Sequence, residues 1–280
     1  MPVFVHYLPE IRIKILGMSI LKGVNLMKII FLKKRKLILL GTFFLLLVII
    51  ISLNDKVTTV ITKSLKPIYA VKTDTNQIAI TFDISWGEEN VIPILEILKA
   101  KDIKATFFLS SPWAEKKPEL VKRIVEDGHE VGSHGRRHVD LNTLSESELI
   151  NELNISKSVL EEITGKKINL LRPPNGAYDN KVISVANNLG YKVIQWSVDS
   201  LDWKKPGPNA VINNIVNGRQ KNKGAAPGDI LLFHASDSAP DTPKALPSII
   251  EALNSKNYEL VPVGTLLNNA KEYWPPESNF

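Results

Sequence analysis

Two histidines four residues apart, His134 and His138, stand in the segment SHGRRH. Imidazoles at this spacing can bind one cation through their ring nitrogens, and a catalytic zinc ion typically takes three protein ligands and a water molecule. The segment TFDISWG contains the carboxylate of Asp83, but the next residue is Ile84, which cannot bind a cation. The sequence therefore predicts an incomplete metal site. A polar loop with two hydrogen-bonded histidines is the alternative interpretation.

Three further segments carry side chains suited to acid–base chemistry. Asp83 could act as a general base on water, and Arg172 in RPPNGAY could hold that carboxylate ionised. In SVDSLDW, Asp202 could orient an imidazole, and His234 at the end of DILLFH could act as a general acid for a leaving amine. Each residue alone has an ordinary alternative, such as a cap, a rigid turn or core packing. Together they supply a base, an acid and a partner for each.

The elements that must position these residues alternate along the chain. Short β-rich apolar segments predict seven strands, over residues 78–82, 104–109, 130–134, 168–171, 192–196, 229–233 and 258–261. Helical segments separate them, over residues 91–101, 118–127, 145–164, 180–189, 209–220 and 243–254. This alternation predicts an α/β fold with a parallel sheet, closed as a distorted (β/α)7 barrel. The polar segments above follow strands, so we expect them to meet at one rim.

Charge is distributed unevenly along the 280 residues, whose net charge is +6. Residues 1–72 carry 12 basic and two acidic side chains, whereas the remainder carries 23 basic and 27 acidic ones. The basic residues of the remainder are scattered, so no nucleic-acid partner is predicted. No protein partner is predicted either. The absence of cysteine excludes disulfides, a zinc–cysteine site and a thiol nucleophile.

The excess positive charge lies beside a hydrophobic segment. Lys33, Lys34, Arg35 and Lys36 precede an uncharged run over residues 37–53. Its length and its polar end favour an uncleaved transmembrane helix over a cleaved signal peptide. The basic cluster should stay cytoplasmic, so we expect a single-pass protein of the cell membrane with its main domain extracytoplasmic.

These patterns predict five segments. Residues 1–26 are a leader of doubtful status, since translation could begin at Met27 or Met18. Residues 27–53 form the basic flank and membrane anchor, and residues 54–75 a linker. Residues 76–268 form the main domain, and residues 269–280 a tail.

Five ordered motifs carry a resemblance: TFD, H-x-x-x-H, RPP-x-G, D-x-x-D-W and L-x-H. They resemble the polysaccharide deacetylases of carbohydrate esterase family 4, also called the NodB homology family. The resemblance covers residues 76–268 and implies the distorted (β/α)7 barrel of that family. The segment DISWG and the membrane leader look most like those of the sporulation (PdaB-type) branch of the family.

The resemblance implies a role for each matching residue. Asp83 matches the catalytic base, Arg172 the residue that braces it, His234 the catalytic acid and Asp202 the residue that tunes that acid. His134 and His138 match two metal ligands, whereas Ile84 replaces the third. Substrate-binding residues are expected at Asn175, through its backbone N–H, and at Trp203 and Leu232, which line the acetyl pocket.

The implied reaction is metal-assisted N-deacetylation of a cell-wall glycan, with peptidoglycan during spore formation as the expected substrate. The implied cofactor is a divalent metal, usually zinc, held weakly or not at all because Ile84 contributes no ligand. A second hypothesis follows from the same substitution: a catalytically impaired, glycan-binding or morphogenetic protein on this fold. A different hydrolase chemistry is the third, because a fold does not fix a reaction.

Overall fold

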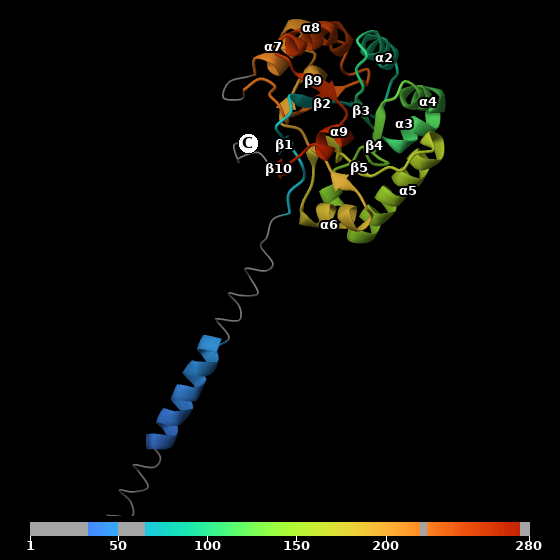
Figure 1. Ribbon diagram of the computed structural model, residues 1–280. Helices are drawn as coiled ribbons and strands as arrows, with labels where there is room; N and C mark the ends of the chain where they lie inside the picture. Colours follow the sequence, from blue (N-terminus) through green and yellow to red (C-terminus); the bar gives the residue numbers. More distant parts are fainter. Residues whose placement is uncertain (1–32, 50–64, 219–222, 275–280) are drawn as a thin grey trace, which may run out of the picture. The chain divides into compact units, whose positions relative to one another are not determined.

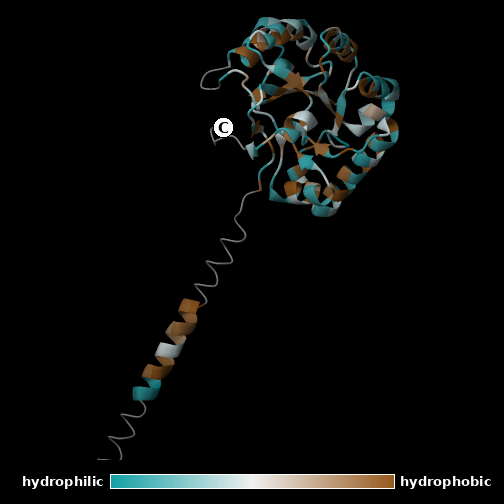
Figure 2. Ribbon diagram, viewed as in Figure 1, coloured by the Kyte–Doolittle hydropathy of each residue, from teal (hydrophilic) through white to brown (hydrophobic). Residues whose placement is uncertain are grey.

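The structure is a computed structural model that describes residues 33–49, 65–218 and 223–274. The chain forms two compact units, Met1–Lys63 and Ser64–Phe280. Residues 33–49 are helical, and Figure 2 shows hydrophilic residues at the start of this helix and mostly hydrophobic ones after them. Within the described residues, no helix is both long and apolar enough to cross a membrane. The leader, the alternative start sites, residues 27–32 and 50–53 of the expected flank and anchor, most of the expected linker and residues 275–280 of the expected tail lie outside the described residues.

A curled sheet of eight parallel strands forms the centre of the second unit (Figure 1). All seven strands predicted from the sequence are present, and β7 is an addition. Along the sheet the order is β6-β5-β4-β3-β2-β8-β7, with β9 also paired to β2. The strands are β2 (Gln77–Ile84), β3 (Thr106–Leu109), β4 (Glu130–Ser133), β5 (Leu170–Leu171), β6 (Lys192–Val193), β7 (Val198–Asp199), β8 (Ile230–His234) and β9 (Glu259–Val261).

One bent stretch of chain, residues 192–199, joins the two ends of this sheet. Its first part, β6, pairs with β5, and its last part, β7, pairs with β8 at the opposite end of the strand order. The sheet therefore curls round on itself, as the predicted distorted barrel requires. The carboxyl ends of its strands consequently face a common rim.

Helices surround the sheet (Figure 1). The six helices predicted from the sequence are present, whereas the short α3 and α9 were not predicted. The Ser145 side chain caps α5 in a capping box with Glu148. The helices are α2 (Val91–Ala100), α3 (Ser111–Lys116), α4 (Pro118–Glu126), α5 (Glu146–Thr164), α6 (Asn180–Asn188), α7 (Pro208–Val216), α8 (Thr242–Asn254) and α9 (Val263–Asn268).

Strand β2 separates two apolar layers because alternate side chains of a strand point to opposite faces. Ile78, Ile80, Phe82 and Ile84 belong to the large core shared with the surrounding helices. Ala79 belongs to a smaller core on the other face, which includes residues of β3, β5, β8 and β9. Asp83 shares the face of Ala79 and therefore points toward the inside of the curled sheet.

The ends of the second unit differ from the sequence-based boundaries. Strand β1 (Ala70–Lys72) pairs with β10 (Glu272–Trp274) in an antiparallel two-stranded sheet. Ile68 and Val71 are buried in the smaller core. Strand pairing and burial therefore extend before residue 76 and beyond residue 268, on both sides of the expected domain. Neither short strand was found because both lack the apolar run of a central strand.

His129 lies at the rim opposite the polar segments and is buried, with its Nδ1 accepting a hydrogen bond from the backbone N–H of Ala105 at 3.1 Å. Burial, with the nearby charge of Lys104, lowers the pKa of His129 to about 4. In the unfolded chain the imidazole binds a proton near pH 6.5, well above its pKa in the folded protein. The contribution of neutral His129 to the free energy of unfolding is therefore fully present above pH 6.5 and is lost as the pH falls to 4.

The free energy of unfolding should fall between pH 7 and pH 4. We expect this fall to be about 2 to 3 kcal/mol smaller in His129→Asn than in the wild type. The amide oxygen of asparagine can accept the same hydrogen bond without titrating. Urea unfolding at a series of pH values between 7 and 4 measures the effect. An unchanged difference in stability between these pH values would show that His129 does not titrate as described.

Candidate active site

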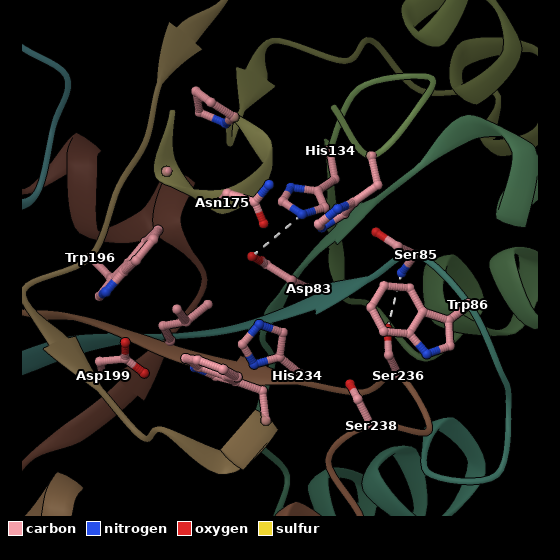
Figure 3. Close-up of a pocket in the computed structure, with 15 residues that line it drawn as sticks. Asp83, Ser85, Trp86, His134, Asn175, Trp196, Asp199, His234, Ser236 and Ser238 are labelled. Atoms are coloured by element: carbon pink, nitrogen blue, oxygen red, sulfur yellow. Dashed lines mark hydrogen bonds and ion pairs between the residues drawn. The ribbon is translucent and has the colours of Figure 1, made fainter. Parts of the chain in front are cut away.

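The predicted site residues that touch solvent meet in one pocket of about 470 Å³ at the carboxyl ends of the strands (Figure 3). Arg172 and Asp202 are fully buried behind it. Sequence reasoning did not assign several residues of the wall, among them Trp86, Trp196, Asp199, Ser236 and Ser238. The predicted residues in the wall are Asp83, His134, His138, Asn175, Trp203, Leu232 and His234.

Asp83 and Arg172 form a buried ion pair. Nη1 of Arg172 donates to Oδ1 of Asp83 at 2.8 Å and to Oγ1 of Thr81 at 2.7 Å, and Nη2 donates to the carbonyl oxygen of Gln195 at 3.0 Å. Burial acts to raise the pKa of Asp83, but the charge of Arg172, with smaller effects from the nearby histidines, holds that pKa below its usual value. The carboxylate is therefore ionised at neutral pH.

His234 and Asp202 form a second pair. Oδ1 of Asp202 lies 2.7 Å from Nδ1 of His234, and Oδ2 accepts from the His234 backbone N–H at 2.8 Å and from Thr242 Oγ1 at 2.6 Å. Burial acts to lower the pKa of His234, but the hydrogen bond and charge of Asp202 outweigh it and raise that pKa. The imidazole is thus held with its Nε2 available to the pocket and with its protonated form favoured.

The two predicted histidine ligands lie close together, but no third metal ligand lies beside them among the described residues. Nδ1 of His134 lies 2.8 Å from the carbonyl oxygen of Arg172, which leaves Nε2 facing Asp83 Oδ2 at 3.8 Å. The rings of His134 and His138 are 5.4 Å apart between centroids. Ile84 is fully buried in the core on the helix side and does not line the pocket. Over the described part of the chain, no cluster of three or more histidine, cysteine or acidic side chains is placed to hold a metal ion.

A buried carboxylate, Glu152 of α5, fixes the loop between the two histidines. Its Oε1 accepts from the backbone N–H of Arg136 at 2.9 Å and from that of Arg137, and its Oε2 accepts from Arg137 Nε at 2.9 Å. The side chain is 1% exposed. Glu152 lies on the buried face of its helix, and a charged residue among apolar ones at that position is the signal that could have found it.

We expect Glu152→Gln to destabilise the domain by about 1 to 3 kcal/mol, since an amide cannot accept all three hydrogen bonds. Zinc affinity should fall with it, because the loop that carries His138 loses its fixed position. Urea unfolding and a zinc titration measure the two effects. Glu162→Gln, on an exposed position of the same helix, is the matched control and should change neither.

Asn175 occupies a position that suits its residue type. Its φ is 56°, a left-handed conformation that asparagine tolerates better than most residues. Its side chain donates to Asp140 Oδ1 at 2.8 Å, which directs the amide away from the loop backbone. Asn175 and Gly176 of the η2 turn (Pro174–Gly176) both line the pocket.

Comparisons with known proteins agree with this geometry. A family model described as polysaccharide deacetylase matches residues 70–194. A peptidoglycan-N-acetylglucosamine deacetylase of Bacillus cereus is 31% identical over 198 residues, which are 70% of this chain and 70% of that protein. The uncharacterized protein YlxY of Bacillus subtilis is 29% identical over 206 residues, 74% of this chain, and the match spans only 62% of YlxY.

A solved structure extends the comparison to the fold. BA3943 of Bacillus anthracis, described as a CE4 family pseudoenzyme, matches with a TM-score of 0.67 and 32% identity, over 72% of this chain and 69% of that one. A mutant of BA3943, described as having restored enzymatic activity, matches with the same TM-score. Structures of this kind thus include both inactive and active forms.

Proposed function

Because the chain belongs to the polysaccharide deacetylase family, we propose that it removes acetyl groups from N-acetylated amino sugars of peptidoglycan. One observation carries the proposal. Asp83 and His234 are direct partners in the register of the neighbouring strands β2 and β8, so a base and an acid stand side by side at one pocket. A protein that only binds glycan needs neither.

The side chains divide the reaction between them. Asp83, ionised beside Arg172, accepts a proton from the attacking water. The backbone N–H of Asn175 stabilises the oxygen of the acetamide carbonyl as it becomes negative. His234 donates a proton from Nε2 to the sugar nitrogen as the carbon–nitrogen bond breaks, and Asp202 stabilises the imidazolium. Acetate and a free amine leave, and the wall formed by Trp203 and Leu232 contacts the acetyl methyl group.

A divalent metal, most typically zinc, fits this pocket only in part. His134 and His138 would hold it, and a bound ion would polarise the acetamide carbonyl as a Lewis acid. Two imidazoles without an anionic ligand predict weak binding. The residues named above supply every proton transfer.

The position of Ile84 favours a second function, a catalytically impaired glycan-binding protein. Its side chain contributes to the core and not to the pocket, so the site has lost a ligand without a described replacement. On this hypothesis the pocket still binds glycan, and the chain acts in morphogenesis of the cell wall.

Acetate release separates the two functions. The full-length protein is assayed with N-acetylglucosamine oligomers and with peptidoglycan, with zinc or cobalt added, and its bound metal is measured. We expect slow release that depends on added metal and that Asp83→Asn abolishes. Binding of glycan with no acetate on any substrate would establish the impaired protein instead, and no binding at all would exclude both.

A carboxylate at position 84 tests the metal site. Ile84→Asp places a charge in an apolar core, which should cost about 2 to 5 kcal/mol in the metal-free protein. Residue 84 ends β2, so a carboxylate driven from the core would turn to the rim. We therefore expect zinc to raise the unfolding midpoint more in Ile84→Asp than in the neutral control Ile84→Asn. Equal responses to zinc would show that residue 84 cannot reach the histidines.

We also propose that the N-terminal segment anchors the protein in the cell membrane with the domain outside, where it acts in spore formation. The basic cluster before the apolar run supports this orientation. Digestion of the domain by protease in intact cells, compared with lysed cells, tests the location. Comparison of the spore wall glycan with and without the gene tests the stage.

A further inference from the structure

Trp86 is a large apolar side chain that half-faces solvent at the mouth of the pocket. It is 51% exposed, and it lines the pocket beside His138, with ring centroids 5.8 Å apart in an edge-on arrangement. A single exposed hydrophobic residue needs no explanation in general. This one lies in the wall of the proposed active site, where apolar contacts define what binds.

The loop that carries Trp86 is fixed by hydrogen bonds on both sides. The backbone N–H of Ser85 donates to Ser236 Oγ at 3.1 Å, and Trp113 Nε1 donates to the carbonyl oxygen of Gly87 at 2.6 Å. Gly87 has a φ of +76°, and a Cβ there would lie 2.0 Å from the carboxyl carbon of Asp237. These contacts hold the backbone on both sides of Trp86, so a ligand that packs on the indole ring does not have to order the loop first.

The surroundings of the ring suit a sugar. Figure 3 shows Trp86 and Trp196 on opposite sides of the pocket, with Asp83 and His234 between them. The hydroxyl-bearing residues Ser236 and Ser238 lie on the side of Trp86. A pyranose ring has an apolar face of C–H groups that packs on an aromatic ring and an edge of hydroxyl groups that hydrogen-bonds. The indole face and the serines match these two features.

We propose that Trp86 forms a second sugar subsite, which holds the residue of the glycan chain next to the one being deacetylated. The inference rests on the proposed function, because it takes the reacting sugar to lie over Asp83 and His234. Trp86 stands outside that position, against His138, so its ring meets a neighbouring sugar. The protein consequently selects a chain over a single amino sugar.

The test compares short and long oligomers of N-acetylglucosamine by isothermal titration calorimetry, using the full-length protein. The wild type should bind the pentasaccharide more tightly than the disaccharide. Trp86→Ala should weaken pentasaccharide binding about 10-fold and disaccharide binding much less, since one aromatic contact is lost. Trp86→Phe should retain part of the preference. Tyr273→Ala, at another exposed aromatic residue outside the pocket, should change neither affinity.

Each result decides the inference. Equal binding by the wild type and Trp86→Ala would overturn the subsite and leave the proposed function intact. An equal loss for both oligomers would also overturn it, because Trp86 would then contact the reacting sugar or position His138. If the wild type bound no oligomer and no peptidoglycan, the proposed function and the subsite would both fall. Thermal unfolding of Trp86→Ala and Trp86→Phe confirms that the variants are folded.

Discussion

Replacing Arg172 with methionine is expected to destabilise the domain by about 3 to 5 kcal/mol, the typical cost of leaving one partner of a buried ion pair without the other. Arg172 is fully buried, and Asp83 is only 5% exposed. The change also removes the hydrogen bonds that Arg172 donates to Thr81 and to the Gln195 carbonyl oxygen. Urea unfolding at neutral pH measures the loss.

The double variant Arg172→Met with Asp83→Asn identifies the cause. If the loss comes from a buried charge without a partner, removing the charge should restore a large part of the stability. The two single variants should then combine non-additively, as expected of residues in contact. A double variant that is destabilised by the sum of the single effects would show that packing of Arg172, and not its charge, stabilises the site.

Replacing Asp202 with asparagine is expected to reduce acetate release about 10²- to 10⁴-fold, the usual contribution of a general acid. Oδ2 of Asp202 accepts two hydrogen bonds, so the amide oxygen should take that place and the amide N–H₂ should face His234 Nδ1. The imidazole then accepts at Nδ1 and loses the charge that raises its pKa. The protonated acid is thereby lost at neutral pH.

The pH dependence of acetate release should shift to lower pH in Asp202→Asn. In the wild type the raised pKa of His234 keeps the acid protonated to higher pH, so the activity should fall only above that pKa. In Asp202→Asn the same fall should begin at lower pH. Thr242→Val, which removes one hydrogen bond to Asp202 but keeps its charge, is the control and should leave the profile nearly unchanged. A lower rate with an unshifted profile would contradict the assigned role of Asp202.

The central fold could be predicted from the sequence because its signals are local. Apolar runs predicted the seven strands, and the helical segments between them predicted the six helices. The pairing of β1 with β10 joins residues some two hundred positions apart and leaves no local pattern. Strand β7 was missed for a related reason, since residues 192–199 bend and change partners within one stretch.

The site residues that directly follow a predicted strand could be found from the sequence, because the carboxyl ends of parallel strands meet at one rim. Asp83, Arg172, Asp202 and His234 have the contacts with each other that were expected of them, and their catalytic roles stay predictions. Glu152 and Trp86 were not assigned because their roles depend on contacts. Glu152 accepts hydrogen bonds from a loop 15 residues away in sequence. Trp86 is identified as a wall residue only by its contact with His138. Spacing places Glu152 among the buried positions of its helix, but neither its loop partner nor the contact of Trp86 with His138 can be inferred from spacing.

The bent stretch of residues 192–199 ties the existence of the pocket to the completion of folding. Trp196 and Asp199 come from this stretch, Asp83 and His234 from β2 and from β8, which pairs with β7, and His134 follows β4 on the other side of β2. Contacts between segments so distant in sequence form late, because a long loop must be ordered before they gain anything. A chain that has assembled only β2 to β5 has half a wall and no cavity. The pocket is therefore complete only once the sheet has closed.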